Sequence, residues 1–129
     1  MSLRSPLGRV RGLGSAKEGV THFWAQRMTA LALIPLTVWF VVSLLCVLGA
    51  DHAAVKAWVG SPVVAGLLIL LIAATFYHAF LGLQVVIEDY VHGEGLKLAA
   101  LAAVKGASWL LAVIGVLSVL VLLLGETPA

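Results

Sequence analysis

The chain has 129 residues, of which 62% are hydrophobic and 11% are charged, and its mean hydropathy is +1.11. Soluble globular domains carry about 25% charged residues, so this composition excludes an ordinary water-soluble domain and indicates a membrane protein. The formal net charge is only +2, and the basic residues are not interleaved with aromatic ones, which argues against nucleic-acid binding. The length is that of one domain.

Three segments contain no Asp, Glu, Lys or Arg: residues 28–50, 57–87 and 106–125. A hydrocarbon core about 30 Å thick is crossed by about 20 helical residues. Backbone amides in lipid must pair within their own segment, which requires helices. Ser61 followed by Pro62 is typical of a helix start. The sequence therefore predicts an all-α integral membrane protein with three transmembrane helices, at about 27–49, 61–91 and 97–124.

Basic residues are distributed unevenly about these spans. Of the eight Lys and Arg residues, only Lys56 lies in the loop between the first and second spans. The other seven lie at or before the start of the first span, or after the second. The positive-inside rule then places the N-terminus in the cytoplasm and the C-terminus outside. We expect a cytoplasmic tail over residues 1–26 and a transmembrane domain over residues 27–126.

The second span carries one histidine deep within its uncharged stretch. Nine residues separate His78 from the first following charge, Glu88, which corresponds to about 14 Å of helix. Ionisable groups at such depth are rare and usually functional. An imidazole there suits three roles: a haem ligand, a proton relay, or a hydrogen-bond partner of another helix. Gly82, one turn further along the same face, leaves room for a flat macrocycle or for a packed helix.

Asp89 and Tyr90 stand at the C-terminal end of the same span. Asp89 follows His78 by three turns plus about 20°, so both residues share one helix face, about 16 Å apart along the axis. A tyrosine at headgroup level is ordinarily an interfacial anchor, and an acidic helix end is ordinarily solvated. The alternative is a quinone site, in which Tyr90 donates a hydrogen bond to a carbonyl and Asp89 orients the site or relays a proton.

The pattern His78-x3-Gly82-x-Gln84-x4-Asp89-Tyr90, with the segment 21–30 that enters the first span, resembles the hydrophobic membrane anchor subunit of succinate dehydrogenase, respiratory complex II. The resemblance covers essentially the whole chain in length, topology and charge placement. It implies a membrane anchor that packs with a partner of homologous topology, the cytochrome b subunit, and that binds the iron–sulfur and flavoprotein subunits. The retained basic N-terminal segment favours a bacterial inner membrane over a mitochondrial inner membrane.

The resemblance also implies roles for individual residues. His78 matches the position that supplies one axial ligand to the iron of a haem b, whose other ligand comes from the cytochrome b subunit. Asp89 and Tyr90 match the acidic and tyrosine residues of the family's ubiquinone site. Arg27 matches an arginine near the haem propionates and the quinone pocket, although a snorkelling anchor is an equal alternative. His22 is one residue out of register with a histidine of some relatives, so we expect interfacial solvation for it.

Two alternatives stay open from the sequence. One is a non-redox structural anchor, in which His78 only forms a hydrogen bond to a neighbouring helix. The other is the anchor of a fumarate reductase-type quinol enzyme, although a dihaem version would need more than one deep histidine. The chain is not catalytic alone, because it has no flavin-binding fold and only one cysteine, Cys46, where iron–sulfur clusters need several.

Overall fold

Within residues 6–11 and 19–125, which the computed structural model describes, three long helices dominate the fold. They are α2 (Gly19–Val47), α4 (Pro62–Tyr90) and α5 (Glu94–Leu124), and each is long and apolar enough to cross a membrane. The same described ranges also contain the short helices α1 (Pro6–Val10) and α3 (His52–Gly60). The prediction of an all-α fold with three spans is confirmed.

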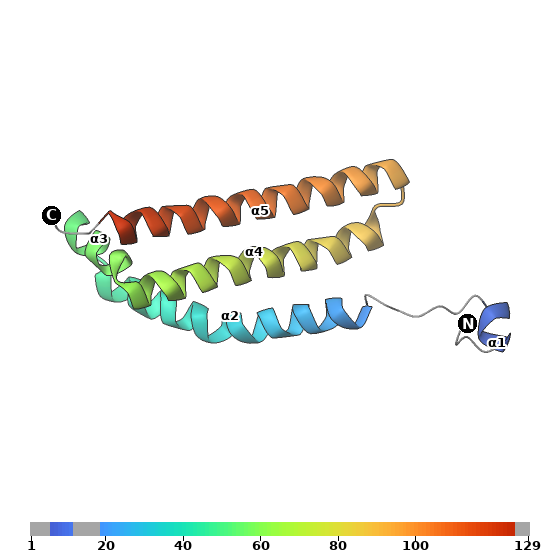
Figure 1. Cartoon of the computed structure of the whole chain (residues 1–129), viewed down its shortest axis with the longest axis horizontal. Coiled ribbons are helices and arrows are strands. Elements are labelled where there is room, and N and C mark those ends of the chain that lie inside the picture. Colours follow the sequence, from blue (N-terminus) through green and yellow to red (C-terminus); the bar gives the residue numbers. More distant parts are fainter. Residues whose placement is uncertain (1–5, 12–18, 126–129) are drawn as a thin grey trace.

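Helix α4 lies in the middle of the bundle and packs against both other long helices (Figure 1). A short connection at residues 91–93 returns the chain into α5, which runs back beside α4. The start of α2 and this connection lie at one end of the bundle, whereas α3 and the end of α5 lie at the other. The residues predicted to form the quinone site therefore lie at the end where α2 begins.

Helix α2, the first of the three long helices, begins earlier than the predicted first span. It starts at Gly19 rather than near residue 27, because the charge of Arg27 limits contact with lipid but does not interrupt backbone hydrogen bonding. Helix α4 begins at Pro62, as the Ser61-Pro62 pair predicts, although the Ser61 side chain forms no capping hydrogen bond. The division into a tail and a transmembrane domain stays a prediction. Residues 1–5, 12–18 and 126 of that division lie outside the described residues.

Helix α3, which the sequence analysis does not predict, is held at its N-terminus by Asp51. The Asp51 Oδ1 atom accepts a hydrogen bond of 2.8 Å from the backbone N–H of Ala54. An N-cap of this kind satisfies one of the amides that a helix start leaves free. The cap explains why nine residues form a helix in the loop between two spans.

Replacing Asp51 with Ala should therefore loosen α3 while leaving the long helices intact. Loss of an N-cap side chain lowers the stability of a helix by about 1 kcal/mol, and the effect is largest in the first turn. Amide hydrogen exchange of residues 53–56 should accelerate about fivefold, which is what 1 kcal/mol corresponds to. Asp51→Asn keeps a side-chain oxygen and should retain most of the protection. Equal exchange in Asp51→Ala and the unmodified protein would contradict the capping role.

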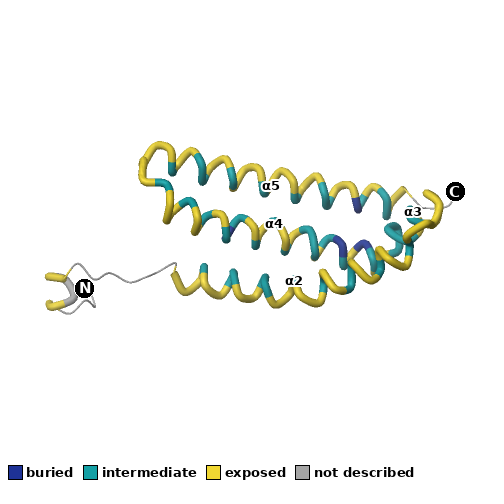
Figure 2. The backbone as a smooth tube through the Cα atoms, turned by 180° about the vertical axis from the view of Figure 1, so that it is seen from behind, coloured by how far each residue is buried: buried dark blue, intermediate teal, exposed yellow. Residues whose placement is uncertain are grey.

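Few side chains are buried within the chain itself. The core cluster consists of Ala65 and Leu68 from α4 with Val119 from α5, and Leu81 is buried separately. Figure 2 shows these positions as short dark segments on α4 and α5, whereas most of each helix is exposed. Exposed apolar surface of this extent needs lipid or partner helices to cover it.

Helices α4 and α5 approach each other closely at Gly115. A Cβ atom built there would lie 3.1 Å from Ile72 Cγ2 and 3.3 Å from Ile72 Cδ1, which is tighter than an ordinary van der Waals contact. Small residues at helix crossings let membrane helices pack closely, and such packing is a main source of their association in lipid. The absence of a side chain at Gly115 therefore sets the distance between α4 and α5.

Candidate functional site

A polar contact joins α2 to α4 at the level of His78. The Thr29 Oγ1 and His78 Nδ1 atoms lie 2.9 Å apart, and both residues are half-buried. Among the residues that the structure describes, it is the only hydrogen bond between side chains of two different long helices. The Gln84–Glu88 bond lies within α4. The residues are 49 positions apart in the chain, so the contact depends on how the two helices pack.

Two further polar side chains extend this contact along α2. His22, Gln26 and Thr29 follow an i, i+4, i+7 spacing, which places them on one helix face. The His22 Nε2 and Gln26 Oε1 atoms are buried and have no hydrogen-bond partner among the described residues. Such unpaired atoms are rare and cost about 1–3 kcal/mol each. We refer to His22, Gln26, Thr29 and His78 as the polar strip, and it has hydrogen-bonding capacity left for another molecule.

The position of His22 differs from the interfacial solvation that we expected. Its ring is half-buried, and its Nε2 atom is shielded. The reason is that α2 begins at Gly19, so His22 belongs to the helix and lies against the bundle rather than in a solvated loop. Gln26 and Thr29 were not among the predicted site residues. Their helical spacing from His22, at the entrance to an otherwise apolar span, was the signal that could have identified them.

Gly82 of α4 faces the polar strip. A Cβ atom there would lie 3.7 Å from Gln26 Nε2, which is an ordinary van der Waals distance. The described residues of this chain therefore do not by themselves require a glycine at this position. Gln84 takes no part in the strip, because its Nε2 atom donates a hydrogen bond of 2.8 Å to Glu88 Oε1 one turn away.

Asp89 and Tyr90 lie at the very end of α4 and are both exposed, with 77% of the Tyr90 surface accessible. Neither side chain forms a hydrogen bond or ion pair with another described residue. About 16 Å of helix separates Asp89 from His78. The structure therefore does not bring the predicted quinone-site residues together with the polar strip, and it leaves them free to contact a partner.

Arg27 lies on a different side of α2 from the polar strip. Its guanidinium carbon is 5.2 Å from the centre of the Phe23 ring, a cation–π distance, and the side chain is exposed. Two residues along a helix correspond to a rotation of about 200°, so Arg27 points away from the face that carries Thr29. Any contact between Arg27 and a group bound near His78 would therefore involve a surface shared with a partner.

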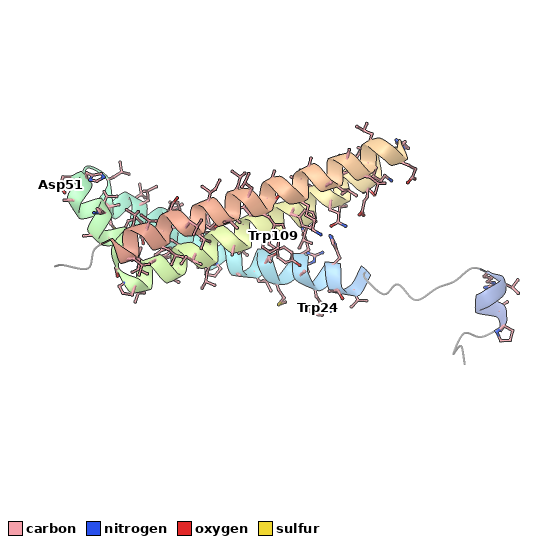
Figure 3. The ribbon with its side chains drawn as sticks, turned by 45° about the horizontal axis from the view of Figure 1, so that its top comes forward. Trp24, Asp51 and Trp109 are labelled. Carbon is pink, nitrogen blue, oxygen red and sulfur yellow. The ribbon has the colours of Figure 1, made fainter. Side chains whose placement is uncertain are left out.

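An apolar groove lies elsewhere, between α4 and α5. It has a volume of about 590 Å³ and an almost entirely apolar lining, which includes Leu70, Tyr77 and Trp109. Figure 3 shows Trp109 partway along α5, between Trp24 near the start of α2 and Asp51 at the far end. A groove of this composition suits an acyl chain or an apolar helix, and it has no part in the polar site.

The side chains of the polar strip include the donor and acceptor atoms that one axial ligand of a haem would need. Such a ligand requires a neutral imidazole with a free lone pair and a neighbour that orients the ring. Thr29 engages one ring nitrogen of His78, and the other has no partner among the described residues. The unpaired atoms of His22 and Gln26 suit polar substituents on the same group. The described residues hold no cluster of three or more His, Cys, Asp and Glu for a bare metal ion.

These features define a class of protein: a three-span membrane subunit with little interior of its own and a polar strip between two spans. A family model described as the succinate dehydrogenase/fumarate reductase transmembrane subunit matches residues 1–124. The chain belongs to this family of transmembrane subunits, which confirms the resemblance found in the sequence.

Bacterial relatives named succinate dehydrogenase hydrophobic membrane anchor subunit are similar over most of the chain. The protein of Rickettsia bellii is 32% identical over 102 residues, which cover 79% of this chain and 82% of that protein. The protein of Paracoccus denitrificans is 32% identical over 100 residues, 78% of each chain. The protein of Rickettsia conorii is 30% identical over 95 residues, 73% of this chain and 75% of that one. No solved structure matches the chain significantly.

Proposed function

We propose that this chain is the hydrophobic membrane anchor of a succinate dehydrogenase in a bacterial inner membrane, where it supplies one axial ligand to a haem b and part of a quinone-reduction site. The observation that carries this proposal is His78, an imidazole well inside a membrane span, which Thr29 orients through one nitrogen while the other has no partner among the described residues. The family match and the relatives' names support the anchor role.

The remaining parts of the enzyme come from partner subunits. A flavoprotein would oxidise succinate, an iron–sulfur subunit would carry the electrons, and a cytochrome b subunit would supply the second axial ligand. The exposed apolar surface of α2 and α5 provides the area against which a three-span partner would pack. A haem b held by His78 would add a site that accepts and returns one electron at a time.

Quinone reduction requires two electrons, which the iron–sulfur subunit supplies, and two protons from the aqueous phase. Tyr90, exposed at the end of α4, donates a hydrogen bond to a carbonyl oxygen of ubiquinone in a pocket shared with the partners. Asp89 beside it takes up protons from the water at this end of the bundle. Arg27 offers an exposed guanidinium for a propionate or for a carboxylate of the quinone pocket.

The test is a dithionite-reduced minus oxidised optical spectrum of the affinity-purified assembly. The unmodified assembly should show the bands of a b-type haem, and His78→Ala should abolish or distort them, because the iron loses a ligand. His92→Ala, in the connection between α4 and α5, is the matched control and should leave the spectrum unchanged.

Two results would contradict the haem proposal. Absence of haem from the unmodified assembly would favour the non-redox anchor, in which His78 serves only helix packing. An unchanged haem spectrum in His78→Ala would assign the ligand to another residue or subunit.

The family description also includes fumarate reductase, so a quinol-oxidising enzyme is the second candidate. The names of the relatives from Rickettsia and Paracoccus favour the succinate-oxidising direction. The ratio of succinate–quinone to quinol–fumarate activity in the purified assembly distinguishes the two, and a ratio well below one would favour the second candidate.

A further inference from the structure

Thr29 and His78 form more than a helix-packing contact, because the Thr29 hydroxyl has three neighbours of different kinds. Its Oγ1 atom lies 2.7 Å from the carbonyl oxygen of Ala25, 3.1 Å from that of Gln26, and 2.9 Å from His78 Nδ1. Both carbonyl oxygens can only accept a hydrogen bond, whereas the ring nitrogen can donate or accept, depending on the tautomer.

The distances around the Thr29 hydroxyl favour one tautomer of His78. A hydroxyl has one hydrogen, and the 2.7 Å separation from Ala25 is the usual length of an O–H···O bond, so that hydrogen points to the carbonyl. The Oγ1 atom then presents a lone pair to the ring. In that arrangement Nδ1 carries the hydrogen and donates it to Oγ1 across 2.9 Å, a usual length for an N–H···O bond.

We propose that Thr29 is a positioning residue that holds His78 in the Nδ1–H tautomer and thereby reserves the Nε2 lone pair for the haem iron. This inference rests on the proposed function and deepens it. A neutral imidazole has one hydrogen between its two nitrogens, so fixing it on Nδ1 leaves Nε2 as the acceptor atom. The same hydrogen bond restrains the rotation of the ring, because it ties His78 of α4 to α2, the helix that packs against it.

The hydrogen bond also sets the donor strength of the imidazole. An acceptor on the Nδ1–H group makes the opposite nitrogen more basic, and loss of such a partner typically costs about 10- to 100-fold in metal affinity. A more basic ligand favours the ferric over the ferrous iron. Removal of the hydroxyl should therefore raise the midpoint potential of the haem and weaken its retention, without touching the ligand itself.

The experiment compares Thr29→Val, which is nearly isosteric and lacks the hydroxyl, with Thr29→Ser, which keeps it. Each is measured in the purified assembly by redox titration of the haem, by its low-spin ferric EPR signal and by haem content per complex. Thr29→Val should raise the midpoint potential, shift the EPR signal and lower haem content, whereas Thr29→Ser should resemble the unmodified assembly. Thr37→Val, an exposed threonine of the same helix, is the matched control.

The outcomes separate this inference from the proposed function. If Thr29→Val has an unchanged potential and EPR signal, or if Thr29→Ser shifts them as far as Thr29→Val does, the assignment of the tautomer to Thr29 is overturned. If the unmodified assembly has no haem, or His78→Ala leaves its spectrum intact, the proposed function fails and this inference with it. Membrane-bound succinate oxidation with a soluble acceptor reports assembly of each variant. Should Thr29→Val not assemble, Thr29→Ala removes the same hydroxyl without introducing a methyl group in its place.

Discussion

Replacing Tyr90 with Phe should lower succinate-dependent reduction of a quinone by about tenfold or more, since a positioned proton donor contributes about 10²- to 10⁴-fold to a rate. The hydroxyl lies at the end of α4, where 77% of the residue's surface is accessible and no described residue of this chain pairs with it. Its removal should therefore leave the fold intact. Succinate oxidation measured with a soluble dye should change little, because that reaction does not use the quinone pocket.

The chain offers a matched control for this variant in Tyr77, the other tyrosine. Tyr77 lies on the same helix and lines the apolar groove against α5, away from the end of the bundle. Tyr77→Phe should leave both activities close to those of the unmodified enzyme. Equal loss of the quinone and dye activities in Tyr90→Phe would point to a defect of assembly and would remove Tyr90 from the quinone site.

Gly115→Val should sharply reduce the stability of the assembled complex, although Gly115 belongs neither to the polar strip nor to the proposed quinone site. Its Cβ atom would lie 3.1 Å from Ile72 Cγ2, and its two methyl groups would need further space between α4 and α5. Overpacking of this kind costs about 1–3 kcal/mol. Thermal denaturation of the purified complex should show a lower midpoint, and less complex should be recovered from the membrane.

Gly106 provides the comparison within the same helix, because a Cβ atom there would meet nothing within 4 Å among the described residues. Gly106→Val should leave the denaturation midpoint nearly unchanged. Combining Gly115→Val with Ile72→Ala should recover part of the lost stability, since the clashing side chain is shortened. Equal destabilisation at the two glycines would show that α5 depends on glycine flexibility rather than on close packing at Gly115.

The spans were predictable because uncharged length is a direct requirement of a lipid bilayer. The start of α4 at Pro62 followed from local helix-start chemistry. The start of α2 was not predictable from the same evidence, because Arg27 marks a boundary of lipid contact and not of helical hydrogen bonding. Helix α3 escaped prediction because it is short and depends on the Asp51 cap in a segment with no strong periodicity.

The candidate site was predictable along one helix but not across two. The distance along the chain from His78 to Asp89 places both on one face of α4, and that inference needs only the helical repeat. The pairing of His78 with Thr29 depends on how far each helix is rotated about its axis, which no spacing within α4 reveals. For the same reason the sequence did not predict the polar contacts of His22 and Gln26. The burial of the His22 Nε2 and Gln26 Oε1 atoms depends on how the helices pack.

The sparse interior of this chain has a consequence for how the cell must produce it. A copy without partners leaves the His22 Nε2 and Gln26 Oε1 atoms unpaired. Among the residues that the structure describes, its buried apolar side chains are only Ala65, Leu68, Leu81 and Val119. Proteins of marginal stability are continuously removed by proteases. We therefore expect unassembled copies to be degraded faster than copies within the complex.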